Sequence, residues 1–70
     1  MEAMAYTLIL LANSSFVGYY SSQESCEQAV RAIYSKRVDP YGYMHSSIRN
    51  NTVDIMMKHK YPREYLCQKN

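Results

Sequence analysis

Hydrophobic residues at the start of this chain form two short runs separated by a polar turn. The first run, AYTLILLA at residues 5–12, is apolar on both faces of an extended chain. This is typical of a central strand covered on each side, or of a strand in a dimer interface. NSS at residues 13–15 is a turn signal, and FVGYY at residues 16–20 is a second β-prone run. The first twenty residues therefore predict a β-hairpin.

The next stretch, SSQESCEQAVRAIYSKR at residues 21–37, has the period of an amphipathic helix. Ser21 and Glu24 have the spacing of a capping box, in which each side chain satisfies a free amide at the helix start. Pro40 disfavours helical backbone at the residue before it, so the helix should end there. Five residues form one apolar stripe along this helix: Cys26, Ala29, Val30, Ile33 and Tyr34.

The segment SSIRNNTVDIMMKHK, residues 46–60, admits two interpretations. A helix would place Ile48, Thr52, Ile55, Met56 and His59 on one face. A hairpin turning at Asn50 and Asn51 is favoured, because Asn tolerates the positive φ angles of a two-residue turn and is a poor residue inside a helix. After a further turn at residues 61–64, YLCQ at residues 65–68 predicts a short edge strand.

These elements predict one α+β domain spanning residues 1–70. Its antiparallel sheet is built from two β-hairpins, and one amphipathic helix at about residues 21–37 packs on that sheet. A domain of this size buries only about 60% of the surface that its unfolded chain exposes. A partner or a cross-link would therefore add to a marginal stability.

Two cysteines, Cys26 and Cys67, raise the question of metal, catalysis or a cross-link. They and the two histidines, His45 and His59, are isolated in the sequence, so the chain has no metal-binding spacing. A cysteine on the core stripe of a helix is usually an inert small hydrophobe. A disulfide between the two cysteines would staple the domain, but the absence of a secretion signal indicates a reducing compartment and favours two buried thiols.

Targeting signals and catalytic motifs are absent from the sequence. The apolar run at residues 5–12 is too short to cross a membrane, and an acidic residue precedes it where a signal peptide would carry basic ones. We therefore expect a cytoplasmic protein without membrane association. The carboxylates are scattered, and the chain lacks a glycine-rich phosphate loop and the G-x-S-x-G motif. The sequence predicts neither an enzyme nor a bound cofactor.

Charge and tyrosine content indicate contact surfaces. Residues 1–30 carry three glutamates and no basic residue, whereas residues 31–70 carry all eight basic residues against three acidic ones. The chain has eight tyrosines, whose amphipathic and rigid side chains suit half-exposed contact positions. If the second hairpin forms, its outer face or its end gathers a candidate partner-binding set. That set is Tyr41, Tyr43, Arg49, Lys58, Lys60 and Tyr61.

The order of these features resembles a known group of proteins. An apolar first strand, the helix YYSSQESCEQAVRAI with its S-x-x-x-C-x-x-A spacing, and a late YLCQ are similar to small accessory proteins of tailed phages and prophages. The resemblance covers the first half and the last six residues, and the tyrosine-rich middle departs from it. It implies a protein that binds a host protein complex, for example to inhibit a defence or repair machine.

Two functions are consistent with the sequence. The first is a small protein-binding module, with a host protein as partner or a second copy bound through the N-terminal hairpin. Its support is the small size, the absence of a catalytic set, the tyrosines and the predicted edge strand. The second is a nucleic-acid-binding protein, because cations neutralise phosphates and aromatic rings stack on bases.

Overall fold

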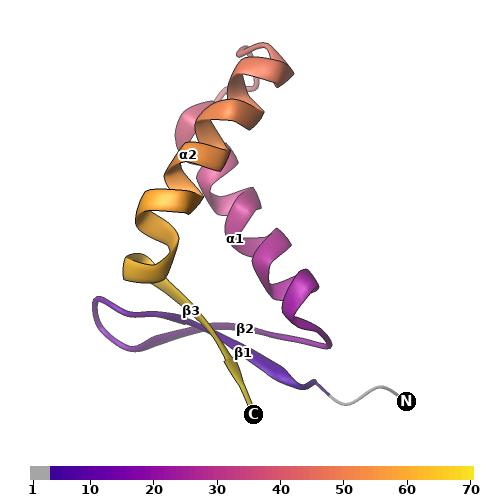
Figure 1. Ribbon diagram of the computed structural model, residues 1–70, viewed down its shortest axis with the longest axis vertical. Coiled ribbons are helices and arrows are strands. Elements are labelled where there is room, and N and C mark those ends of the chain that lie inside the picture. Colours follow the sequence, from indigo (N-terminus) through magenta and orange to yellow (C-terminus); the bar gives the residue numbers. More distant parts are fainter. Residues whose placement is uncertain (1–3) are drawn as a thin grey trace.

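The computed structural model describes residues 4–70, apart from the side chains of residues 60–63. Its elements are β1 (Tyr6–Leu10), β2 (Ser15–Tyr20), α1 (Gln23–Val38), α2 (Ser46–Glu64) and β3 (Tyr65–Lys69). The three strands form one antiparallel sheet, and the two helices stand on the same face of it (Figure 1). The α+β class is confirmed, with one hairpin and two helices in place of two hairpins and one helix.

The sheet has the strand order β2-β1-β3, with β1 in the centre as its apolar run predicts. Leu8 of β1 lies opposite Gly18 of β2 and Cys67 of β3. A bulge on β2 leaves Val17 without a partner, because the next residue of β1, Ile9, pairs with Phe16. The first hairpin and the C-terminal edge strand are therefore confirmed.

Helix α1 begins one residue later than the capping box predicts. The cap is Ser22, whose extended backbone places its hydroxyl to accept a hydrogen bond from the amide of Ser25 at 3.1 Å. Ser21 therefore does not cap the helix, although Glu24 remains in the first turn, where its charge favours the helix dipole. The helix ends before Pro40, as expected.

The prediction of a second hairpin turning at Asn50 and Asn51 is wrong, as is the predicted turn at residues 61–64. One continuous helix, α2, spans both segments. The two asparagines face solvent, where each costs only about 0.5 kcal/mol of helix propensity. In the helix, Val53 becomes buried, and Met56 and Met57 pack against the core. Burial of these side chains outweighs the local preference for a turn.

The helical alternative for this segment was correct in period and only partly correct in the face it would bury, since Met56 packs against the core as that face requires. Ile48 and Ile55, which it placed on the apolar face, are 60% and 52% exposed. The buried side of α2 instead centres on Val53, which contacts the residues of α1 and the sheet.

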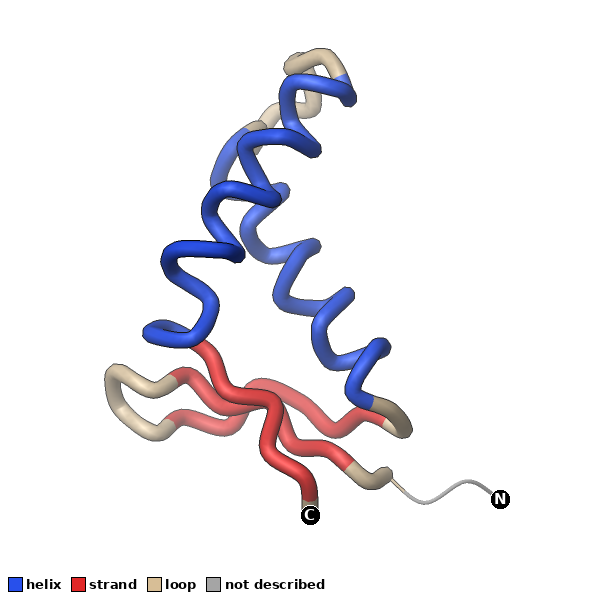
Figure 2. Tube along the Cα trace, viewed as in Figure 1, coloured by secondary structure: helices blue, strands red, loops and turns tan. Residues whose placement is uncertain are grey.

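The core lies between the sheet and the halves of the helices nearest to it. Its buried residues are Leu8, Cys26, Val30, Tyr34, Val53 and Tyr65. Farther from the sheet the helices converge on the loop that joins them (Figure 2). Between residues 35 and 52 no side chain is fully buried. The molecule therefore has a packed sheet end and a thinly packed opposite end.

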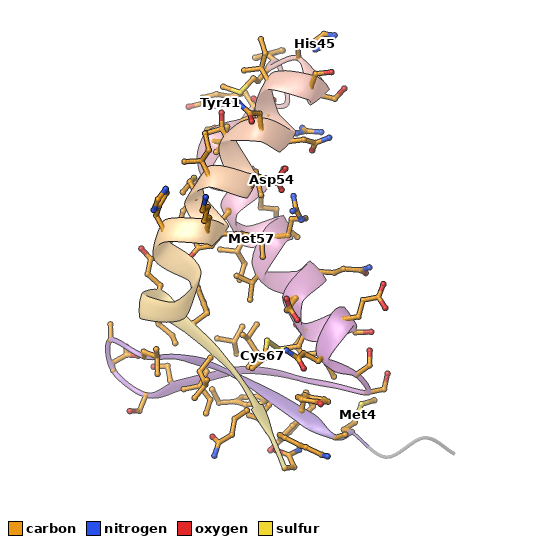
Figure 3. All side chains as sticks on the ribbon, viewed as in Figure 1. Met4, Tyr41, His45, Asp54, Met57 and Cys67 are labelled. Atoms are coloured by element: carbon orange, nitrogen blue, oxygen red, sulfur yellow. A yellow bond between two sulfur atoms is a disulfide. The ribbon has the colours of Figure 1, made fainter. Side chains whose placement is uncertain are left out.

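Cys26 and Cys67 form a disulfide, and the prediction of two free thiols is wrong. The register places Cys67, labelled in Figure 3, on the helix face of β3, and Cys26 lies near the start of α1, with the two Cα atoms 6.1 Å apart. The bond joins residues separated by 41 positions. Most of α1, the whole of α2 and the loop between the two helices lie within this covalent loop.

Candidate functional site

The structure separates the residues of the predicted partner-binding set. Tyr41 and Tyr43 lie in the loop between the helices, whereas Arg49 and Lys58 lie on α2. Nine residues of an α-helix turn through two and a half turns, so these two cations project from opposite sides, about 13 Å apart along the axis. The side chains of Lys60 and Tyr61 lie outside the described residues. The described members therefore form no continuous basic face.

The two loop tyrosines do lie together. We call residues 39–48 the tip, because they form the end of the helix pair that is remote from the sheet (Figure 3). The side chains of Tyr41 and Tyr43 are 81% and 89% exposed, and their rings stack with centroids 6.3 Å apart and an interplanar angle of 23°. Met44 and Ile48 add exposed apolar surface beside them.

Asp39 holds the tip in shape. Its carboxylate accepts hydrogen bonds from the amides of Tyr43 at 2.8 Å and Met44 at 2.7 Å. Its backbone carbonyl accepts a bond of 3.2 Å from the amide of Gly42, which has a φ of +75° that favours glycine. Sequence reasoning missed this residue, although Asp before Pro-Tyr-Gly is a pattern typical of a turn in which the side chain binds the following amides.

Arg49 completes the Asp39 site from the first turn of α2. One guanidinium nitrogen, Nη1, lies 3.7 Å from Oδ2 of Asp39. Burial of Asp39 acts to raise its pKa, but the amides of Met44, Tyr43 and Gly42, together with the Arg49 charge, hold that pKa below its usual value. Asp39 is therefore ionised at neutral pH. Arg49, predicted to contact a partner, lies next to this carboxylate and offsets its charge.

Two other arginines are also engaged by carboxylates. Arg31 on α1 forms an ion pair with Asp54 on α2. Arg37 donates a hydrogen bond of 2.7 Å to Oε2 of Glu64, and its guanidinium lies 5.3 Å from the centroid of the Tyr34 ring. These pairs join the two helices, so much of the basic excess in the second half of the chain is balanced locally.

Tyr34 belongs to the same cluster at the boundary of the core. Its hydroxyl donates to Oε2 of Glu64 at 3.2 Å, and its ring meets the ring of Tyr65 edge to face at 5.9 Å. Burial, and then the neighbouring Glu64 carboxylate, raise the pKa of Tyr34 to about 12. The phenol therefore stays protonated and structural at any physiological pH.

A second exposed apolar surface lies on the sheet face that the helices leave uncovered. Leu8 faces the core, so its neighbours on β1 point to the opposite face together with their partners on β2 and β3. We call this surface the open face, formed by Thr7, Ile9, Phe16, Tyr19, Leu66 and Gln68. The bulge at Val17 brings Phe16 and Tyr19 to the same side, with ring centroids 4.6 Å apart.

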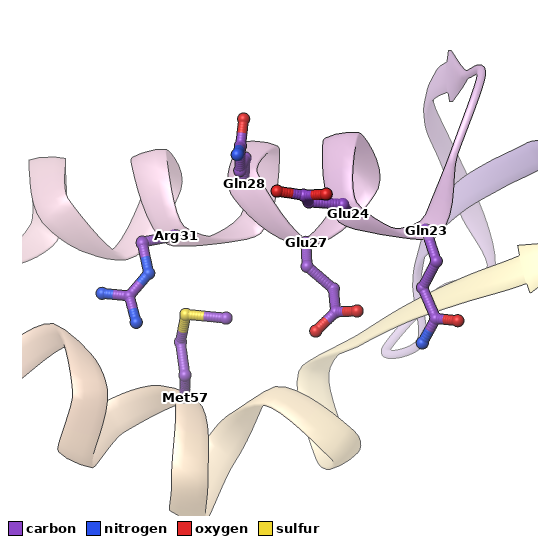
Figure 4. Close-up of a pocket in the computed structure, with 6 residues that line it drawn as sticks. All are labelled: Gln23, Glu24, Glu27, Gln28, Arg31 and Met57. Atoms are coloured by element: carbon purple, nitrogen blue, oxygen red, sulfur yellow. The ribbon is translucent and has the colours of Figure 1, made fainter.

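A shallow groove of about 400 Å³ runs between the helices (Figure 4). It is lined by Gln23, Glu24, Glu27, Gln28, Arg31 and Met57. The α1 side chains supply two carboxylates, two amides and the guanidinium of Arg31, and the thioether of Met57 lies on α2. This lining offers polar contacts and holds no Ser, Thr, Cys or Lys beside a base.

The described residues show neither a metal-binding cluster nor a membrane-spanning helix. That part of the chain holds no group of three or more His, Cys, Asp or Glu placed to bind a metal ion. Neither of its helices combines the length and the apolar character needed to span a membrane. Comparison of the chain with protein-family models, curated proteins and solved structures gives no match.

Proposed function

We propose that this chain is a protein-binding module that contacts its partner through the tip. The observation that carries the proposal is the stacked, almost fully exposed pair of Tyr41 and Tyr43 on an ordered loop. Tyrosine is enriched among the residues that dominate binding energy, because it offers a large contact area with few rotatable bonds to immobilise. A loop already fixed by Asp39 loses less entropy when it binds.

The chemistry of the tip indicates the kind of partner. Residues 40–48, PYGYMHSSI, contain no Asp, Glu, Lys or Arg. Recognition would therefore rely on apolar contact and on hydrogen bonds from the two phenol hydroxyls. A protruding loop of this composition suits a cleft in another protein that is apolar and carries hydrogen-bond acceptors.

The identity of the partner rests on the resemblance to phage accessory proteins. That resemblance suggests a host protein complex, and a tip that occupies one of its clefts would act as an inhibitor. Cytoplasmic localisation remains a prediction, and we note that disulfides such as Cys26–Cys67 are typical of oxidising compartments.

Nucleic-acid binding remains the alternative function. The positions of the cations give it less support than the sequence alone does. The exposed aromatic pair at the tip could stack on bases, but the tip supplies no cation to neutralise phosphates. Arg31, Arg37 and Arg49 are each engaged by a carboxylate. A protein that releases few counterions binds nucleic acid weakly at physiological salt.

Capture of partners from a nuclease-treated bacterial lysate tests the proposal. The bait is the disulfide-bonded chain, compared with a variant carrying Tyr41→Ser and Tyr43→Ser. A matched control carries Lys36→Gln and Lys58→Gln, two exposed cations on the helices. We expect a protein that the parent and the lysine variant both capture and that the tyrosine variant captures about tenfold less or worse.

The opposite pattern would support the nucleic-acid function. The proposal is contradicted if a protein is captured only when the nuclease is omitted. It is also contradicted if the lysine variant loses the captured protein while the tyrosine variant keeps it. Sub-micromolar binding of the parent to a single-stranded oligonucleotide at physiological salt would contradict it as well.

A further inference from the structure

The open face is unusual because most of its side chains are apolar or aromatic and none carries a charge. Phe16, Tyr19 and Leu66 are 58%, 59% and 43% exposed. Lys69 is the one charged residue in the three strands, all of which the structure describes. Its partner on β1, Tyr6, packs against the core, so Lys69 belongs to the helix side of the sheet and not to the open face. An antiparallel sheet with helices on one side normally presents polar residues on the other.

The absence of charge makes this face compatible with a second copy of itself. In a twofold-symmetric contact the same patch meets itself, so a face that carries charge of one sign brings like charges together, whereas an uncharged face does not. Thr7 and Gln68 are the polar members, and both are neutral. The charged residues of the described chain lie mainly on the two helices, away from this surface.

The edges of the sheet are less suited to self-association than the face. The bulge at Val17 interrupts the ladder along β2, and Lys69 places a charge on β3. Bulges and edge lysines are the devices by which proteins prevent pairing between sheet edges. No comparable device covers the open face among the described residues.

The exposed area sets the strength of such a contact. Phe16, Tyr19 and Leu66 together expose about 300 Å² on each copy, from the usual areas of these side chains. Two copies would then bury roughly 600–800 Å² in total, about half of a standard interface of about 1,600 Å². An interface of this size supports a weak dimer in equilibrium with the monomer.

We infer that two copies of this chain associate through their open faces, forming a sandwich of two three-stranded sheets with the helices outside. Packed sheets lie about 10 Å apart, which leaves room for one interdigitated layer of Phe16, Tyr19 and Leu66 from each copy. The two tips then point away from the interface in opposite directions. This inference is independent of the proposed function, because the tip takes no part in the contact.

Sedimentation velocity over a concentration series of about 10 µM to 1 mM tests the inference. The mass of the parent should rise with concentration from 8.2 kDa toward twice that value. A variant with Phe16→Thr and Leu66→Thr should stay at 8.2 kDa throughout, because threonine keeps the strand propensity and removes the apolar contact. A control with Ile48→Thr removes exposed apolar surface at the tip and should dimerise as the parent does.

Amide chemical shifts recorded during dilution of the parent locate the contact. We expect the shifts that change to belong to the six open-face residues. Circular dichroism confirms that the threonine variant is folded; if it is not, the single variant Tyr19→Lys replaces it and should also remain monomeric.

Several results would overturn the inference. They are a parent that is monomeric at the highest concentration, a folded threonine or Tyr19→Lys variant that still dimerises, and shifts that map to a sheet edge or the tip. Loss of a captured foreign protein by the threonine variant, with a monomeric parent, would instead assign the open face to that protein. If the capture experiment shows no role for the tip, the sedimentation and chemical-shift measurements still test the dimer.

Discussion

The two ends of this molecule both expose a pair of aromatic rings, but they are supported in different ways. At the sheet end, Phe16 and Tyr19 lie on a sheet whose other face is packed against the core and cross-linked by a disulfide. At the tip, Tyr41 and Tyr43 lie on a loop without a buried apolar side chain, held by the carboxylate of Asp39. The tip takes its order from hydrogen bonds, and the sheet end takes its order from burial and a covalent bond.

Under the proposed function, this difference separates the residues that stabilise the fold from those that contact the partner. A change at the tip removes few buried contacts, so its sequence can vary at little cost to the fold. A change to a core-facing residue at the sheet end alters the packing of the core. The following predictions test this separation, starting with the change that should affect the sheet end most.

Removal of the disulfide should have the largest effect. The chain-entropy estimate for a loop of 41 residues is about 4 kcal/mol, so a variant with Cys26→Ser and Cys67→Ser should lose most of the free energy of unfolding of a small domain. Urea unfolding measures this loss, and the reduced parent serves as the matched control. A loss below about 1 kcal/mol would show that packing alone holds the sheet end.

Truncation of Val53 should have an intermediate effect. Val53→Ala removes two methyl groups from a side chain that is 1% exposed and should cost about 2 kcal/mol. Ile55→Ala, two residues along the same helix and half exposed, should change the free energy of unfolding by less than about 0.5 kcal/mol. Equal effects in thermal or urea unfolding would contradict the buried face assigned to α2.

Loss of the Asp39 carboxylate should have the smallest effect on global stability and a large local one. In Asp39→Ala the amides of Tyr43 and Met44 lose their acceptors, so their hydrogen exchange should accelerate several-fold while the exchange of core amides is unchanged. Asp39→Asn is the control, because its amide oxygen can still accept one bond. Unchanged exchange at both amides would show that the tip is ordered by other contacts.

Acid should mimic this substitution in the parent. The pKa of Asp39 in the folded chain lies below its ordinary value of 3.8, so the unfolded chain takes up the proton first. The contribution of Asp39 to tip order is therefore complete at neutral pH and is lost as pH falls below 3.8 through the folded-state pKa. Amide exchange measured in this acidic range checks the direction.

Secondary-structure elements that depend on neighbouring residues can be predicted from this sequence. Elements that depend on contacts between distant residues cannot. The first hairpin and α1 carry their turn, cap and periodicity locally, and β1 shows in its apolar run that it is central. The identity of α2 was missed because two asparagines favour a turn, whereas the burial of Val53 depends on packing against α1 and the sheet. Local preference is the weaker term when a buried face is available.

The candidate site was predictable only in part. Tyr41 and Tyr43 were identified from composition, and the pattern of Asp39 before Pro-Tyr-Gly could have indicated an ordered loop. The assignment of Arg49 and Lys58 to one surface followed from the wrong hairpin and failed with it. The spacing of the cysteines could not predict the disulfide, because they are 41 positions apart in the sequence and are brought together by the tertiary fold, including the register of β3 with β1.

The disulfide also decides what happens when the tip is cut. Exposed loops are the preferred sites of proteolysis, and the tip lies inside the covalent loop closed by Cys26 and Cys67. A single cleavage there yields two fragments that remain joined and separate only after reduction. Since lengthening a loop costs little free energy, foreign peptides can be inserted at the tip between flanks that stay tethered. The chain thus has the properties of a scaffold for displaying grafted loops.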